Sequence, residues 1–318
     1  MYRPAQLAGY FALVLTAGAL LVNSATAPVS LSTGTVGVQI GLVLTAAVAG
    51  VVEHRRELSQ FETPGFDRSD GIDALAVVAG AVVTYALSVS AGLGPVLASA
   101  LVGLLVGLTI PEVGAPAYCG SFVGMASPAV FASLEFVALA GVVAGLGFVA
   151  STESFGGVGG KLGTLALFGC VTTAAIVGLD YTSAGPPQWE LVSTIVPVAV
   201  LGAVATVVLS VRLELGAVIG SGVVGVAAGV AFPLAAPELG TTLAAAAFCA
   251  SFVGMSSVER LGGIAHIALV GGLSGFVFLA VTPAFDGAGG KLGTVAFVSC
   301  IGLIGALELR EFAVERMQ

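Results

Sequence analysis

The stretch Gly159-Gly-Lys-Leu-Gly-Thr164 recurs unchanged as Gly289-Gly-Lys-Leu-Gly-Thr294. Lys161 and Lys291 are the only lysines in the chain. Each copy follows a long apolar segment and opens another, so each places a cation and a glycine-rich backbone where a helix is expected to begin. The repetition, 130 residues apart, predicts a chain built by internal duplication.

The composition around these copies determines the class of protein. Of the 318 residues, 57% are hydrophobic and only 9% are charged. Soluble domains contain far more charge. A helix needs roughly 20 mostly apolar residues to cross a bilayer, and such segments follow one another almost without interruption. We therefore predict an all-α, polytopic protein of the cell membrane that crosses the bilayer several times.

A second stretch supports the duplication. Cys119-Gly-Ser-Phe-Val-Gly-Met-Ala-Ser127 matches Cys249-Ala-Ser-Phe-Val-Gly-Met-Ser-Ser257 at the same spacing, and Cys170 and Cys300 also correspond. The interval is too long for a solenoid unit, so a duplicated membrane domain is the better interpretation. The expected parts are two helices and a loop (1–71), a first copy (72–180), a linker (181–190) and a second copy with a C-terminal tail (191–318).

Apolar segments predict the membrane crossings of each part. The clear spans are 7–27 and 35–52; then 72–90, 95–110, 130–151 and 162–178; then 191–211, 216–236, 262–281 and 292–309. Two further segments, 114–127 and 239–257, are either short or broken crossings or re-entrant hairpins. The total is about 12 segments, including these two.

Charges decide between parallel and inverted copies. Four crossings per copy would make the copies parallel, whereas five would invert them. Positive residues favour the cytoplasmic side, and five crossings place Lys161, Arg212 and the C-terminal Arg310 there, with the loop 179–190 outside. We therefore predict inverted repeats with both termini in the cytoplasm.

The lysine motif is the first candidate site. Helix N-termini carry partial positive charge and bind anions, so Lys161 with Thr164, and Lys291 with Thr294, would form anion-binding positions. The inversion predicts that one copy lies near each membrane face, at either mouth of a path. The alternative is a lysine that extends from a connecting turn to the membrane interface. The motif is not a phosphate-binding P-loop, because Leu follows each Lys.

The cysteine-containing stretch is the second candidate site. Hydroxylated and small residues on half-helices are typical of solute sites in inverted-repeat transporters. We expect these residues to bind solute centrally: Ser121, Phe122, Gly124, Ser251, Phe252 and Gly254. The alternative is tight packing, since Gly and Ser let helices approach closely.

Two ionisable residues within apolar segments are candidates for coupling to a proton or cation. Glu135 lies in the segment 130–151, and His266 lies in the corresponding segment of the other copy. Ionisable residues inside membrane spans are functional candidates. A packed or interfacial role is the simpler alternative.

Several function classes are not expected. No hydrolase triad, metalloprotease motif or dinucleotide fingerprint is present, so we predict no enzyme, no cofactor and no metal site. The cysteines are expected to be small buried side chains. A net charge of -8 does not indicate nucleic-acid binding, and abundant acid with scarce lysine indicates a halophilic source.

The sequence as a whole favours a membrane transporter or channel for a small solute, most simply an anion, with its path between two inverted repeats. The alternative is a non-transporting membrane scaffold or complex subunit whose duplicated core serves packing. The expected partners are a small-molecule or ion solute and the lipid bilayer, and the pattern is compatible with a homo-oligomer.

Overall fold

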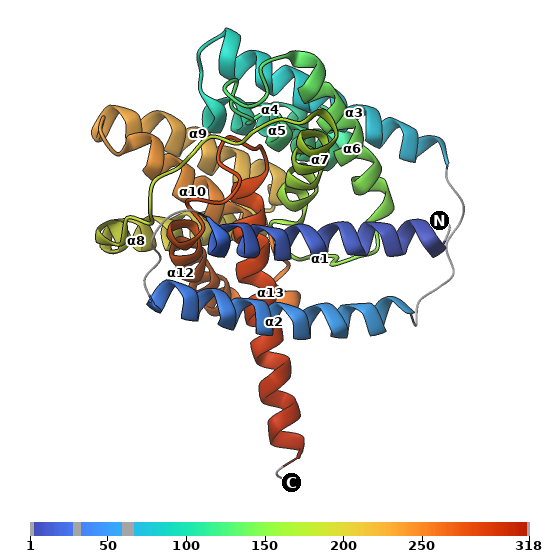
Figure 1. Ribbon diagram of the computed structural model, residues 1–318, viewed down its shortest axis with the longest axis vertical. Coiled ribbons are helices and arrows are strands. Elements are labelled where there is room, and N and C mark those ends of the chain that lie inside the picture. The colour runs from blue at the N-terminus through green and yellow to red at the C-terminus, as the bar shows by residue number, and fades with distance from the viewer. Residues whose placement is uncertain (1–2, 28–32, 59–66, 317–318) are drawn as a thin grey trace.

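The computed structural model describes residues 3–27, 33–58 and 67–316, and every regular element in these ranges is a helix (Figure 1). Six helices are long and apolar enough to cross a bilayer: Pro4–Thr26, Gly34–Arg56, Arg68–Ser90, Trp189–Arg212, Ala217–Ala235 and Lys291–Glu315. The chain is therefore a helical, multi-pass membrane protein.

The elements follow the predicted order. The leading helices are α1 (Arg3–Thr26) and α2 (Thr33–Leu58). Next come α3 (Arg68–Tyr85), the π-helix η1 (Ala86–Ser90), α4 (Pro95–Thr109), the short 3₁₀ helix η2 (Pro111–Val113), α5 (Gly114–Val123), α6 (Leu134–Ala150) and α7 (Lys161–Val177). The remainder comprises η3 (Trp189–Leu191), α8 (Val192–Val207), the π-helix η4 (Val208–Arg212), α9 (Ala217–Ala235), α10 (Gly240–Gly254), α11 (Val258–Leu261), α12 (Ile264–Ala280) and α13 (Lys291–Glu315).

The helices differ from the predicted segments in three places. The polar loop between the second and third spans is shorter than expected, because α2 continues to Leu58 and Asp67 caps α3 at Arg68; residues 59–66 of that loop lie outside the described residues. The segment expected to begin at 130 starts as α6 only at Leu134, and α11 was not predicted. The two doubtful segments are the short, continuous helices α5 and α10.

Residues that correspond in the two halves of the sequence have the same local geometry. The helices α3 and α8 both pass into a π-helix, a distortion that is rare in proteins. Several residues with positive φ also correspond: Gly94 and Gly216 (φ 75° and 80°), Phe155 and Phe285 (φ 51° and 45°), and Gly160 and Gly290 (φ 82° and 83°). The halves therefore share backbone conformation as well as motifs.

Corresponding helices of the two halves pack against each other in opposite directions. Leu97, near the start of α4, lies against Gly229 near the end of α9, while Gly107 near the end of α4 lies against Ile219 near the start of α9. At the N-termini of α7 and α13, Gly160 lies against Phe297 and Gly290 lies against Leu167, on either side of the contact between Gly163 and Gly293. Both pairs are therefore antiparallel.

The crossing of α7 and α13 depends on the absence of side chains. A Cβ on Gly163 would lie 2.5 Å from the Cα of Gly293, and a Cβ on Gly293 would lie 2.5 Å from the Cα of Gly163. Glycine lets helix backbones approach this closely in membrane proteins. The first turns of the two helices consequently touch.

The leading helices pack on both halves. The hydroxyl of Tyr10 in α1 donates to the carbonyl of Gly50 in α2 at 2.8 Å, which joins these helices. Near its start α1 packs through Gly9 on Ala150 of α6. Near its end, Ser24 donates to the carbonyl of Ala280 in α12 at 3.0 Å. Figure 1 shows α13 passing α2 and projecting from the body at its C-terminal end.

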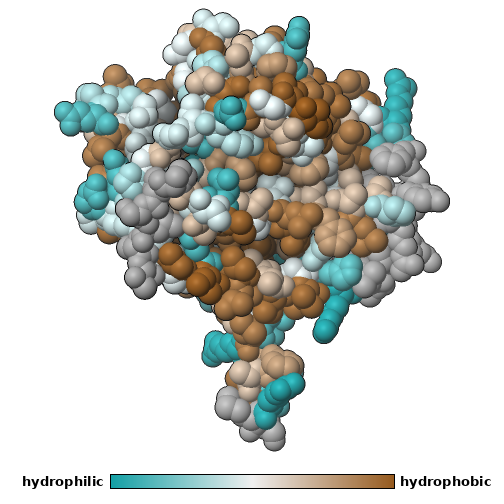
Figure 2. Space-filling view, viewed as in Figure 1, coloured by the Kyte–Doolittle hydropathy of each residue, from teal (hydrophilic) through white to brown (hydrophobic). Residues whose placement is uncertain are grey.

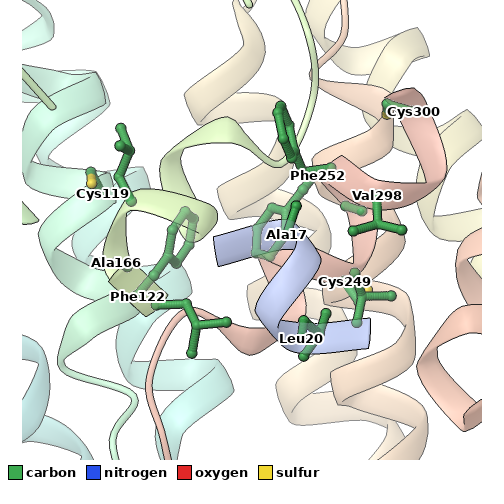
Figure 3. Packing of buried hydrophobic residues seen from close by; sticks show 14 of the residues in the cluster. Ala17, Leu20, Cys119, Phe122, Ala166, Cys249, Phe252, Val298 and Cys300 are labelled. Carbon is green, nitrogen blue, oxygen red and sulfur yellow. The ribbon is translucent and has the colours of Figure 1, made fainter. Parts of the chain in front are cut away.

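Apolar side chains cover much of the outer surface, as Figure 2 shows for one face. On α2 the exposed large apolar residues are Val36, Val38, Ile40, Val43, Leu44 and Val51. The buried core lies where α1, α5, α7, α10 and α13 meet (Figure 3). An apolar exterior of this kind suits a lipid environment.

The glycine contact gives a stability prediction. Replacement of Gly163 by Ala would force the first turns of α7 and α13 apart, and over-packing of this kind costs about 1–3 kcal/mol. We expect Gly163→Ala to lower the thermal unfolding midpoint in detergent. Gly41→Ala is the matched control, because no atom lies within 4 Å of its added Cβ. Equal midpoints for both variants would contradict the proposed role of the contact.

Candidate functional site

Each lysine is the first residue of its helix and reaches back to the end of the preceding long helix. The Nζ atom of Lys161 donates to the carbonyl of Ser151 at 2.5 Å, just beyond the end of α6. The Nζ atom of Lys291 donates to the carbonyl of Thr282 at 2.6 Å, just beyond the end of α12. Cations at helix C-termini satisfy terminal carbonyls and oppose the negative end of the dipole. Both lysines thus have a capping contact.

The threonines of the motif serve their own helices. Thr164 donates to the carbonyl of Gly160, and Thr294 donates to that of Gly290, each at 3.1 Å. Both side chains are completely buried. In this structure their hydroxyl protons therefore stabilise the first turn of α7 and α13.

The two copies of the lysine motif lie together, although the sequence predicted one near each membrane face. Gly163 and Gly293 are in contact, so their helices begin at a common point. The preceding glycines complete the arrangement, with Gly159 against the carbonyl of Phe252 and Gly289 against the carbonyl of Phe122. Glycine-to-backbone contact is the physical reason that the prediction of separate positions was wrong.

Each lysine lines a cavity of its own. The larger cavity, of about 300 Å³, is lined by Lys291 and Asp286 together with residues of both halves, among them Leu97, Met125 and Thr241. The smaller, of about 190 Å³, is lined by Lys161 and Met255 together with Phe122 and Phe252. The position that corresponds to Asp286 is Gly156, so the two cavities differ in charge.

The serines of the short helices are buried in a hydroxyl network. Ser121 donates to the carbonyl of Tyr118 at 2.8 Å and contacts Ser99 at 2.8 Å. Ser251 donates to the carbonyl of Phe248 at 2.6 Å, and its oxygen lies 2.8 Å from that of Ser221. All four serine side chains are fully buried. In this structure the protons of Ser121 and Ser251 are directed to the protein.

The predicted phenylalanines meet at the centre of the core. The ring centroids of Phe122 and Phe252 are 4.6 Å apart, and Tyr118 and Phe248 surround them to form the aromatic cluster. Figure 3 shows Phe122 and Phe252 among the buried side chains of the core. Aromatic pairs at such distances stabilise a core. All four rings of the cluster are buried, and those of Phe122 and Phe252 also line the cavity of Lys161.

The glycines of this stretch serve close packing. A Cβ on Gly124 would lie 2.4 Å from the carbonyl oxygen of Ala81 in α3, and a Cβ on Gly254 would lie 2.4 Å from that of Ala203 in α8. These approaches correspond in the two halves. They match the packing alternative that the sequence left open for this stretch.

The two candidates for coupling lie at helix starts. Glu135 is exposed in the first turn of α6, and His266 is half-buried in the first turn of α12. The Nδ1 atom of His266 is buried without a hydrogen-bond partner among the described residues. Neither side chain lines the cavities of Lys161 or Lys291.

Polar residues of the leading helices hold the two glycine-rich loops, which sequence reasoning missed. Glu53 of α2 forms an ion pair with Arg260 and accepts the backbone N–H of Phe155 at 2.9 Å. Asn23 of α1 accepts the backbone N–H of Phe285 at 3.1 Å. Phe155 and Phe285 occupy corresponding positions in the two halves. The left-handed backbone of Phe155 is held by α2, and that of Phe285 is held by α1. The available signals were Asn23, a polar residue inside the apolar segment 7–27, and Glu53, an acidic residue directly after the segment 35–52.

The linker after α7 packs on the loop that carries Asp286. The hydroxyl of Thr182 donates to Oδ2 of Asp286 at 2.6 Å, and the backbone N–H of Thr182 donates to the Asp286 carbonyl at 3.2 Å. Tyr181 packs edge-on against Phe285, and burial raises the pKa of its phenol to about 12. The phenol is therefore uncharged at neutral pH, and Asp286 is held in a defined position.

Tyr118 is a further residue that the sequence analysis did not single out. Its hydroxyl oxygen lies 2.9 Å from that of Ser221, so it links α5 of the first half to α9 of the second. The corresponding residue is Phe248, which carries no hydroxyl group. The hydroxyl network is consequently asymmetric, and comparison of the two copies could have found this position.

Comparison with protein-family models, with curated proteins and with solved structures found no match to this chain.

The link between Tyr118 and Ser221 can be measured with a double-mutant cycle. Interhelical hydrogen bonds in membrane proteins contribute roughly 0.6 kcal/mol on average. We expect Tyr118→Phe and Ser221→Ala each to lower the free energy of unfolding, with a coupling energy of this order in the double variant. Additive effects in reversible unfolding experiments would show that the two hydroxyls do not stabilise each other.

Proposed function

We propose that this protein is a membrane transporter or channel for a small solute that carries an anionic group. Its path runs between two inverted repeats, which with α1 and α2 make about 12 membrane segments. The single observation that carries the proposal is the pair of cavities, one at each lysine, beside the point where the corresponding helices α7 and α13 meet.

The antiparallel packing of corresponding helices supports the inverted arrangement. A twofold axis that relates α4 to α9 must be perpendicular to both helices, because they run in opposite directions. A twofold axis that relates α7 to α13 must likewise be perpendicular to these two helices. Parallel repeats would be related by an axis along the membrane normal instead, and their corresponding helices would run the same way. The positive-inside rule then places both termini in the cytoplasm.

The two cavities are the openings of the proposed path. In the proposed transporter this arrangement would correspond to a closed state, because the rings of the aromatic cluster are buried between α5 and α10. Opening requires relative movement of the two repeats around this cluster, as in alternating access. The fully buried Ser121 and Ser251 would then become accessible on the short helices.

The lysines favour a solute with an anionic group. The ammonium group of Lys161 donates to the carbonyls of Ser151 and Thr152 at the end of α6, and that of Lys291 donates to the carbonyl of Thr282 at the end of α12. The N-termini of α7 and α13 add partial positive charge at the same place. A carboxylate or inorganic anion would therefore be attracted to each cavity.

A second function, a non-transporting scaffold, is favoured by one observation. Four side chains between the two halves are fully buried: Tyr118, Phe248, Ser121 and Ser251. The hydroxyl groups of the two serines donate to backbone carbonyls of their own helices. A fully buried core of this kind suits packing alone. Flux measurements distinguish the two functions.

The inverted arrangement predicts the sides on which two exposed positions lie. All four native cysteines are buried, so a membrane-impermeant maleimide would report on introduced cysteines. Ser183, in the linker, and Glu315, at the end of α13, are exposed. We expect Ser183→Cys to react from outside intact cells and Glu315→Cys only after the cells are opened. Reaction of both variants from the same side would overturn the five-crossing inverted repeat.

The lysines predict an effect on flux and on selectivity. Proteoliposomes that contain the purified protein would be tested with chloride, nitrate, acetate and neutral amino acids. We expect Lys161→Met and Lys291→Met each to reduce flux about tenfold, which corresponds to roughly 1.4 kcal/mol. Each variant should also shift the reversal potential away from that of an anion-selective path, an effect that a purely capping role would not produce.

Arg212→Met is the matched control, because Arg212 is exposed and lines neither cavity. Unchanged flux and selectivity in both lysine variants would contradict the anion-binding role. Absence of flux for every solute with the wild-type protein would favour the scaffold.

A further inference from the structure

The larger cavity is lined by two residues of opposite charge that form no salt bridge with each other. Lys291 and Asp286 both line it, yet no ion pair joins them in the described part of the chain. Their printed partners are other groups, the carbonyl of Thr282 for the ammonium and the hydroxyl of Thr182 for the carboxylate. Each charged group retains hydrogen-bonding capacity, because an ammonium has three donors and a carboxylate about four acceptor sites.

The rest of the lining is mostly apolar. It includes Leu93, Leu97, Ala244 and Ala245, with a hydroxyl group at Thr241. The volume of this cavity is about 300 Å³. It lies at the lower end of the range for small-molecule sites, about 300–1,000 Å³. The cavity therefore suits a small solute with a short apolar body.

The charged pair is a property of one copy only. The residue that corresponds to Asp286 is Gly156, and the cavity of Lys161 has no acidic residue in its lining. Asp286 is also fixed in place by the linker through Thr182. The carboxylate is thus a specific addition to the second cavity, where the duplication by itself would have supplied a lysine alone.

We propose that the cavity of Lys291 and Asp286 binds a small apolar zwitterion, with its carboxylate on Lys291, its ammonium on Asp286 and its side chain against the apolar lining. This inference rests on the proposed function and specifies the class of solute. A simple anion would satisfy Lys291 but would meet the negative charge of Asp286, and an amine would meet the opposite conflict. Only a solute with both charges pairs with both Lys291 and Asp286. The specificity of the cavity arises from the difference in affinity between such a solute and a solute with one charge.

The proposal is tested by calorimetric binding to the purified full-length protein in detergent. The probes are leucine and alanine as zwitterions, 4-methylpentanoate as the leucine analogue without an ammonium group, and 3-methylbutylamine as the analogue without a carboxylate. We expect leucine to bind at least tenfold more tightly than either single-charge analogue. Asp286→Asn should weaken leucine binding about tenfold while leaving 4-methylpentanoate binding unchanged or stronger. Lys291→Met should weaken binding of both carboxylate-bearing compounds.

Matched controls separate binding from folding. Asp286→Asn keeps an oxygen that can accept the Thr182 hydroxyl, so an unchanged thermal midpoint is expected. Asp180→Asn removes an exposed carboxylate that does not line the cavity, and it should leave all affinities unchanged.

Equal affinities for leucine and 4-methylpentanoate, an effect of Asp180→Asn equal to that of Asp286→Asn, or no binding of leucine and alanine would each overturn the inference. Leucine flux that is unchanged in Asp286→Asn would overturn it as well while leaving the proposed function intact. Selective leucine binding without flux of any solute would support the zwitterion site and overturn the transport function instead.

Discussion

The contact between Gly163 and Gly293 is the constraint on which the rest of the structure depends. It brings the first turns of α7 and α13 together, because a methyl group on either residue would lie 2.5 Å from the other backbone. In a bilayer, helix association relies on close packing rather than on hydrophobic burial. The contact therefore places both lysine motifs at one point and positions the cavity that each lysine lines.

Polar groups around this contact are satisfied by a small set of capping interactions. Non-helical backbone at membrane depth is tolerated only inside protein or beside a cavity, and the loops before α7 and α13 meet this condition in two ways. The lysines bind the carbonyls at the ends of the preceding helices. Glu53 and Asn23 bind the amides of Phe155 and Phe285. The leading helices α1 and α2 thus contribute to the site itself.

Two differences between the halves concern polar groups inside the molecule. Tyr118 carries a hydroxyl that Phe248 lacks, and Asp286 carries a carboxylate where Gly156 has no side chain. The first difference lies in the buried network, with a link to Ser221, and the second lies in the larger cavity. The glycine contacts thus correspond in the two halves, while single residues make the halves chemically different.

The sequence by itself determined the class of protein and the places where helices form, because apolar length and composition are local properties of the chain. It also showed which residues correspond, since repeated motifs need no coordinates. Tertiary structure alone decided that both lysine motifs meet, that Ser121 and Ser251 are buried, and that Asp286 shares a cavity with Lys291. These facts depend on contacts between residues far apart in the chain, and motif spacing carries no information about such contacts.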